Sequence, residues 1–131
     1  MKRLLPAFLL VLALLALAYL LLPRGHTFYG TRLLNPKPVD FALEGPQGPV
    51  RLSQFQDKVV LLFFGFTRCP DVCPTVLADW ARVKRTLGTQ GERVRFVFVS
   101  VDPARDTPQV AQAYAMQFDS SFVGLSGSEL L

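Results

Sequence analysis

Both cysteines of the 131-residue chain lie within five residues, in Cys69-Pro70-Asp71-Val72-Cys73. Thiolates attack disulfides and bind soft metal ions, so two neighbouring thiols indicate redox or metal chemistry. Two ligands are too few for a closed zinc site, whereas Cu(I) tolerates low coordination, so Cu(I) is the metal that the pair predicts. A structural disulfide without further function remains the alternative, although it would close only a very small loop.

The residues around the pair favour the thiolate form. A helix is expected from Pro74, at its first position, to Leu87, with Gly88 ending it and Cys73 near the N-cap. The free N–H groups at the start of this helix, together with the cation of Arg68, stabilise negative charge on sulfur. We therefore expect at least one of the two thiols to have a pKa below the ordinary value of about 8.5.

The hydrophobic patterns around the cysteines predict an α/β domain. Apolar runs at 59–64 and 93–101 indicate two central strands of a parallel sheet, and the first run is typical of a strand buried on both faces. A hairpin with strands at 39–43 and 50–52 precedes them. Helices at 74–87 and 108–118 follow the two strands, and their inward residues are expected to be Val76, Leu77, Trp80, Val83 and Leu87, and Val110, Tyr114 and Phe118.

The loops after the two central strands are expected to meet at one edge of the sheet, because parallel strands end on the same side. The second loop contains Asp102, Arg105 and Asp106. Turn chemistry accounts for Asp106, while Thr107 and Pro108 form an N-cap and first-position pair. Asp102 and Arg105 are expected to help shape the loop that holds the metal.

The N-terminal segment has the composition of a membrane anchor. The run from Leu4 to Leu22 is uncharged and spans roughly 28 Å as a helix, close to the ~30 Å of a bilayer core. Lys2 and Arg3 precede it, which favours a cytoplasmic N-terminus and a domain on the periplasmic side of the cytoplasmic membrane. We expect an anchor at 1–23, a linker at 24–38 and the domain at 39–131. A signal peptide cleaved near Ala16-Leu17-Ala18 is the alternative.

The charge distribution gives no indication of nucleic-acid binding. The formal charge is +4, and Lys2 and Arg3 of the N-terminal segment account for part of it. No block of like charge stands out in the remainder, so an ordinary solvated surface is expected.

Two long motifs resemble the SCO/SenC family, whose members are membrane-anchored proteins of thioredoxin fold implicated in assembling the copper centre of cytochrome c oxidase. They are Phe64-Gly65-Phe66-Thr67-Arg68-Cys69-Pro70-Asp71-Val72-Cys73-Pro74 and Val101-Asp102-Pro103-Ala104-Arg105-Asp106-Thr107-Pro108. The resemblance implies that Cys69 and Cys73 are copper ligands and a redox-active pair, and that Asp71 lies close to the metal. It implies the copper-bearing subunit of the oxidase, or another copper acceptor, as the partner.

The chain departs from the family pattern after the second motif. The resemblance implies a third copper ligand, a histidine downstream of that motif, whereas the one histidine here is His26 in the linker. The sequence also shows no segments that would form the closing strands and the last helix of a thioredoxin fold. The expectation is therefore a C-terminally truncated member whose histidine is encoded further on, and whose strand phenylalanines lack packing partners: Phe63, Phe64, Phe96 and Phe98.

Four functions are compatible with these residues. A copper chaperone is favoured over an enzyme. A thiol–disulfide oxidoreductase would use the same pair to reduce the cysteines of an acceptor. A peroxidase would need Cys73 as an unusually close resolving thiol, and a truncated fragment would have no function.

Overall fold

The computed structural model describes residues 4–21, 30, 31, 34 and 40–127, so His26 and most of the predicted linker lie outside the described residues. The chain divides into two compact units, Met1–Pro36 and Lys37–Leu131. In the first unit, α1 (Leu4–Leu21) is a helix. None of the helices in the described parts of the chain combines the length and the apolar character that crossing a membrane requires. The expected transmembrane anchor is therefore not supported here.

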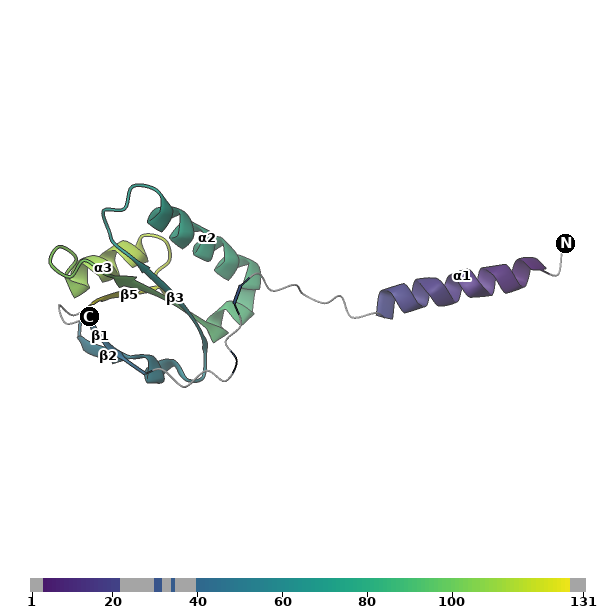
Figure 1. Ribbon diagram of the computed structural model, residues 1–131, viewed down its shortest axis with the longest axis horizontal. Coiled ribbons are helices and arrows are strands. Elements are labelled where there is room, and N and C mark those ends of the chain that lie inside the picture. The colour runs from purple at the N-terminus through teal and green to yellow at the C-terminus, as the bar shows by residue number, and fades with distance from the viewer. Residues whose placement is uncertain (1–3, 22–29, 32–33, 35–39, 128–131) are drawn as a thin grey trace. The chain divides into compact units, whose positions relative to one another are not determined.

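The second unit is an α/β domain built around one sheet (Figure 1). Its strands in the described residues are β1 (Ala42–Gly45), β2 (Gly48–Arg51), β3 (Val59–Gly65), β4 (Val94–Ser100) and β5 (Val123–Ser126), in the order β2-β1-β5-β4-β3. Strands β3, β4 and β5 run parallel, and β1 pairs antiparallel with both β2 and β5. The predicted parallel pairing of the two apolar strands is confirmed.

Helices α2 (Val72–Leu87) and α3 (Pro108–Met116) pack against one face of the sheet. The described residues also form short 3-10 helices at η1 (Leu52–Phe55) and η2 (Gly88–Arg93). The core on this face combines aliphatic residues of the two helices with phenylalanines from β4 and from the position before β5: Leu77, Ala81, Ala111, Ala115, Phe96, Phe98 and Phe122. The indole of Trp80 extends it, with its ring centroid 5.4 Å from that of Phe96 and 6.0 Å from that of Phe63.

The buried faces of both helices agree with the prediction at Leu77, Trp80, Tyr114 and Phe118, which pack in the core, and differ at other positions. Val83 and Val110 were expected inward, yet they are 46% and 42% exposed. Small residues take their places, because an alanine lets the helix backbone approach the sheet closely. The carbonyl oxygen of Ala111 lies 2.2 Å from where a Cβ on Gly124 would stand, so α3 packs directly on the backbone of β5.

Strand β3 lies at an edge of the described sheet rather than at its centre. The expectation that it is buried on both faces is wrong: Val59 and Phe64 are exposed, the four residues between them are half-buried, and only Gly65 of this strand is buried. Strand β4, in contrast, is buried along most of its length. The reason is that β5 occupies the other side of β4. An apolar run predicts a strand, but it does not determine the strand's position in the sheet.

Three of the four strand phenylalanines pack against other residues of the domain, contrary to the expectation from the sequence. Phe96 and Phe98 are buried, and Phe63 contacts both Trp80 and Phe98. Only Phe64 of the four remains largely exposed, at 54%. Side chains alternate between the faces of a strand, so Phe64 points away from the helices that cover its neighbour Phe63.

The N-terminal hairpin is present, with boundaries that differ from the prediction. Strand β1 pairs with β2 up to Gly45 opposite Gly48, which leaves a turn of only Pro46 and Gln47. Gly48 has φ +121°, a conformation that residues with a Cβ rarely adopt. The hairpin joins the parallel strands through Glu44, which lies opposite Ser126 of β5.

Candidate metal centre at the ends of the parallel strands

The cysteine loop and the loop after β4 lie side by side, as the parallel arrangement predicts. Strand β3 ends at Gly65, and α2 begins at Val72, with Cys69 in the loop between them. The N–H of Val101, the first residue after β4, donates to the carbonyl oxygen of Gly65 at 2.9 Å. The two loops are therefore held together at the point where their strands end.

Helix α2 begins two residues earlier than predicted, at Val72 rather than Pro74, with Asp71 as its N-cap. Pro74 is tolerated here because the N–H groups of a first helical turn have no acceptor within the helix. The carbonyl oxygen of Asp71 accepts hydrogen bonds from the N–H and the hydroxyl of Thr75, at 3.2 and 2.9 Å. Cys73 consequently lies inside the first turn of the helix.

Cys73 faces the protein core. It shares one side of α2 with Leu77 and Ala81, and only 4% of its surface is exposed. Its Sγ lies 2.8 Å from the position that a Cβ on Gly65 would occupy, and Cε2 of Phe98 lies 3.1 Å from the same point. Burial raises the pKa of the Cys73 thiol, and the hydrogen bond and charge of Cys69 raise it further.

Cys69 is half-buried and has the opposite electrostatic environment. Its Sγ accepts the backbone N–H of Cys73 at 3.4 Å. The hydrogen bond from the Cys73 side chain lowers the pKa of the Cys69 thiol, and backbone hydrogen bonds from Cys73, Asp71 and Val72 add to this effect. The lowered pKa of Cys69 is in the direction expected from the sequence for one of the two thiols. The start of α2 accounts for it, whereas the cation of Arg68 acts on the carboxylate of Asp106.

Asp106 connects the cysteine loop to the rest of the site, a role that the sequence analysis missed. Its buried carboxylate accepts the N–H and hydroxyl of Thr67 at 2.8 and 2.6 Å and the hydroxyl of Ser100 at 2.6 Å. Its carbonyl oxygen accepts the hydroxyl of Ser126 at 2.7 Å. Burial opposes ionisation, but the hydrogen bonds from Ser100 and Thr67 outweigh it and hold the pKa of Asp106 below its ordinary value.

Asp102 and Arg105 form an ion pair with each other, at 3.0 Å between Arg105 Nη1 and Asp102 Oδ2. The Arg105 side chain is 65% exposed. The N–H of Asp102 also donates to the Ser100 hydroxyl at 3.2 Å, and its carbonyl oxygen accepts the N–H of Asp106 at 2.9 Å. These bonds support the loop that carries Asp106, and any direct effect of either side chain on the metal loop stays a prediction.

The donor set of the site fits a soft, low-coordinate metal ion. Cys69 and Cys73 are both free thiols. The carboxylate-bearing residue between them, Asp71, is exposed at the helix N-cap. Within the described ranges there is no group of three or more His, Cys, Asp or Glu side chains placed to hold a metal ion. The two sulfurs are thus the ligand pair that the described residues offer.

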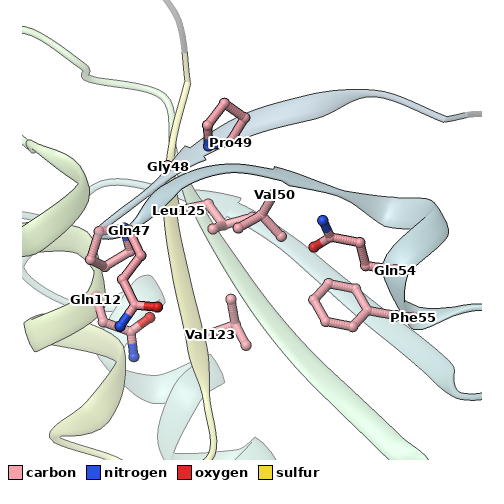
Figure 2. Close-up of a pocket in the computed structure, with 10 residues that line it drawn as sticks. Gln47, Gly48, Pro49, Val50, Gln54, Phe55, Gln112, Val123 and Leu125 are labelled. Carbon is pink, nitrogen blue, oxygen red and sulfur yellow. The ribbon is translucent and has the colours of Figure 1, made fainter.

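A groove lies elsewhere in the domain, between the hairpin and β5 (Figure 2). Its volume is about 570 Å³, and Val50, Phe55 and Val123 form part of its apolar wall. None of its lining residues belongs to the cysteine loop, so the groove and the thiol pair are separate features.

Comparisons with protein families, with curated proteins and with solved structures all lead to the same family. The model of the SCO1/SenC family matches residues 34–130. The solution structure of apo Sco1 from Thermus thermophilus is 72% identical, with a TM-score of 0.75 over 81% of this chain and 62% of that chain. Bradyrhizobium japonicum ScoI, solved with copper bound, is 42% identical, with a TM-score of 0.63 over 69% of this chain and 58% of that chain. The predicted thioredoxin-like fold is confirmed by these structural neighbours.

The mitochondrial SCO2 homolog of Bos taurus is 40% identical over 111 residues, which are 80% of this chain and 42% of that protein. The chain spans about half the length of other curated relatives: 50% of a putative copper-binding protein of Stutzerimonas stutzeri and 44% of an SCO2-like protein of Rickettsia felis.

Proposed function

Because the chain belongs to the SCO1/SenC family, we propose that Cys69 and Cys73 bind Cu(I) and that the protein delivers this ion to a copper site of cytochrome c oxidase during assembly. The observation that carries the proposal is the pair of free thiols at the start of α2, one half-buried with a lowered pKa and the other buried beneath Gly65. Thiolates are the ligands that select Cu(I) among common metal ions.

The two sulfurs have different tasks in this proposal. Cys69 ionises more readily and is the more accessible, so it is the first to engage an incoming ion and the first to give it up. Cys73 provides the fixed side of the site, because its position is set by the packing of α2. Transfer is then a stepwise ligand exchange: a first acceptor thiol loses its proton and displaces Cys69 from Cu(I), and a second displaces Cys73 in the same way. Each released thiolate of this chain takes up a proton.

Copper stoichiometry tests the proposal directly. The full chain, reduced and kept free of oxygen, is titrated with Cu(I) in competition with a chromophoric chelator. We expect one Cu(I) per chain, and loss of tight binding in both Cys69→Ser and Cys73→Ser, because a single thiolate is a poor site. Asp79→Ala is the control, because it removes an exposed ion pair with Arg82 further along α2, and it should retain the ion. Failure of the wild-type chain to retain Cu(I) would overturn the proposal.

A thiol–disulfide oxidoreductase is the second candidate, favoured by the lowered pKa of Cys69 beside a second thiol. In that function Cys69 attacks a disulfide of the acceptor, and Cys73 resolves the mixed disulfide, leaving the acceptor with two thiols and this chain with a Cys69–Cys73 disulfide. Turnover of a disulfide substrate by a chain that retains no Cu(I) would favour this second function over copper delivery.

Membrane attachment with the domain on the periplasmic side is part of the proposal. Its support is the uncharged sequence from Leu4 to Leu22, preceded by Lys2 and Arg3, together with the helical conformation of Leu4–Leu21. Protease added to cells with a permeabilised outer envelope should degrade the domain. Protection of the domain until the inner membrane is lysed would contradict this orientation.

A further inference from the structure

Three exposed apolar side chains border the cysteine pair: Phe66, Val72 and Val101. The two valines have 61% and 59% of their surface exposed, and the phenylalanine has 39%. Single apolar residues on a protein surface are ordinary, whereas several of them around one reactive site indicate a surface that a partner covers. We call these three residues the apolar rim.

Two members of the rim lie next to the sulfurs along the chain and through hydrogen bonds. The carbonyl oxygen of Phe66 accepts the N–H of Cys69 at 3.2 Å, and the N–H of Phe66 bonds to the sulfur of Cys73. Val72 is the first residue of α2 and directly precedes Cys73. These two side chains therefore border the pair on the β3 side and on the α2 side.

The third member comes from the neighbouring loop. The N–H of Val101 donates to the carbonyl oxygen of Gly65 at 2.9 Å. Sγ of Cys73 lies 2.8 Å from the position that a Cβ on this glycine would occupy. The rim thus combines residues from the end of β3, the start of α2 and the end of β4, so it surrounds the pair instead of following one segment.

Exposed charges of both signs accompany the rim. Arg68 and Asp71 lie in the cysteine loop, and both are exposed. Within the described part of the chain, no ion pair includes either of them, whereas Arg105 is paired with Asp102. A complementary partner would place an acidic group against Arg68 and a basic group against Asp71, which would fix its orientation.

Ligand exchange determines what has to cover this surface. An acceptor sulfur must reach the ion while Cys69 still holds it, so the acceptor has to contact the side chains around the pair. We propose that the apolar rim is the docking surface for the copper acceptor, a protein whose own thiols lie in an apolar surface. This inference rests on the proposed function and adds the residues that recognise the partner.

Val101→Ser tests the docking surface in the full chain. The chain, loaded with Cu(I), is mixed with the reduced, metal-free copper-bearing domain of cytochrome c oxidase, and the transfer rate is followed at increasing concentrations of that domain. The concentration at half-maximal rate measures docking, and the maximal rate measures ligand exchange. We expect Val101→Ser to raise the half-maximal concentration about ten-fold, because serine buries less apolar surface against the partner. The maximal rate and the Cu(I) affinity should stay unchanged.

Val59→Ser is the matched control. Val59 is as exposed as Val101, at 62%, but it lies at the opposite end of β3 from the cysteine loop. This variant should leave the half-maximal concentration unchanged. An equal increase in both variants, or no increase in Val101→Ser, would overturn the proposed docking surface.

A copper-free reaction separates this inference from the proposed function. The thiols of the acceptor domain are activated as mixed disulfides with pyridine-2-thiol. Cys69 of the full chain carrying Cys73→Ala attacks one of them, which forms a disulfide between the two proteins and releases pyridine-2-thione. At low acceptor concentration, Val101→Ser should slow this reaction about ten-fold, because docking is weaker.

The reaction of Cys69 with the small disulfide 2,2′-dithiodipyridine needs no docking and should keep its rate in Val101→Ser. If the wild-type chain retains no Cu(I), the proposed function fails, and the ratio of these two rates alone decides the inference. A ratio that Val101→Ser leaves unchanged overturns it.

A second copy of this chain is the competing occupant of the rim. Light scattering of the full chain in detergent micelles measures its mass, and we expect the same mass for the wild type and Val101→Ser. A dimer that Val101→Ser converts to a monomer would show that the rim binds another copy, and the proposal of an acceptor surface would be wrong.

Discussion

Thr67 gives both of its hydrogen-bond donors to Asp106: the backbone N–H at 2.8 Å and the hydroxyl at 2.6 Å. The two residues are 39 positions apart in the chain. Thr67 precedes Cys69 by two residues, and Asp106 lies between β4 and α3, so this pair attaches the cysteine loop to the neighbouring loop. Ser100, at the end of β4, adds a third donor to the same carboxylate.

Asp106→Ala should destabilise the domain by about 2–4 kcal/mol, because it leaves buried donors without an acceptor. Cu(I) affinity should fall as well, since the loop that carries Cys69 loses its attachment. Thermal or denaturant unfolding of the metal-free protein measures the first effect. Asp102→Ala is the control: it removes an exposed ion pair and should cost less than about 1 kcal/mol. Equal losses in the two variants would contradict the assigned role of Asp106.

Gly65→Ala should displace Cys73, because the added methyl group would stand 2.8 Å from its Sγ. We expect a loss of about 1–3 kcal/mol in stability and weaker Cu(I) binding, as for other overpacked core positions. A double-mutant cycle with Cys73→Ala isolates the contact, since removing the sulfur should reduce the cost of Gly65→Ala. Gly30→Ala, with nothing within 4 Å of its new methyl group, should be neutral.

Cys69 should be alkylated before Cys73 in the reduced protein. Its thiol is half-buried with a lowered pKa, whereas the Cys73 thiol is buried with a raised pKa. Limited iodoacetamide treatment near neutral pH, followed by peptide mass spectrometry, measures the order. Cys73→Ala removes the side-chain hydrogen bond that contributes most to the lowered pKa of Cys69, so Cys69 should react more slowly in that variant at neutral pH. Faster labelling of Cys73 than of Cys69 in the wild type would show that the assignment is reversed.

Acid should weaken the link between α2 and the segment before β5. Lys84 Nζ lies 2.7 Å from Asp119 Oδ1. Burial opposes ionisation of Asp119, but its bonds with Lys84 and Ser121 prevail and lower the pKa from 3.8 to about 2. Because the folded-state pKa is the lower one, the contribution is complete above about pH 4 and disappears as the pH falls through about 2.

Asp119→Asn should cost about 1–2 kcal/mol at pH 7 and much less at pH 2, where the pH equals the folded-state pKa and about half of the wild-type carboxylates are protonated. Urea unfolding at a series of pH values measures this difference. A destabilisation by Asp119→Asn that stays constant between pH 7 and pH 2 would mean that the charge of Asp119 does not stabilise the fold.

Several local features followed from the sequence alone. Gly88 ends α2 with φ +55°, and Thr107 caps α3 by accepting the N–H of Val110 at 3.3 Å. The apolar strand at 59–64 and the strand at 93–101 are present and parallel. These features depend on residues within one turn or one strand, where backbone sterics and side-chain periodicity act directly.

The details of the site depended on tertiary packing. Cys73 was expected near the N-cap, yet it is buried inside the first turn because α2 packs against β3 through its face of Cys73, Leu77 and Ala81. Asp106 was interpreted as a turn residue, although the sequence already contained a signal in the two hydroxyl residues that follow apolar strands, Thr67 and Ser100.

The sequence by itself determined that this chain has an α/β domain with two thiols at the start of a helix beside the ends of parallel strands. Only the tertiary structure decided which thiol is buried and which carboxylate supports the cysteine loop. The physical reason is the sequence separation of the interacting residues. Strand and helix formation depend on neighbours along the chain. Burial and hydrogen-bond partners depend on segments that meet only after the sheet has assembled.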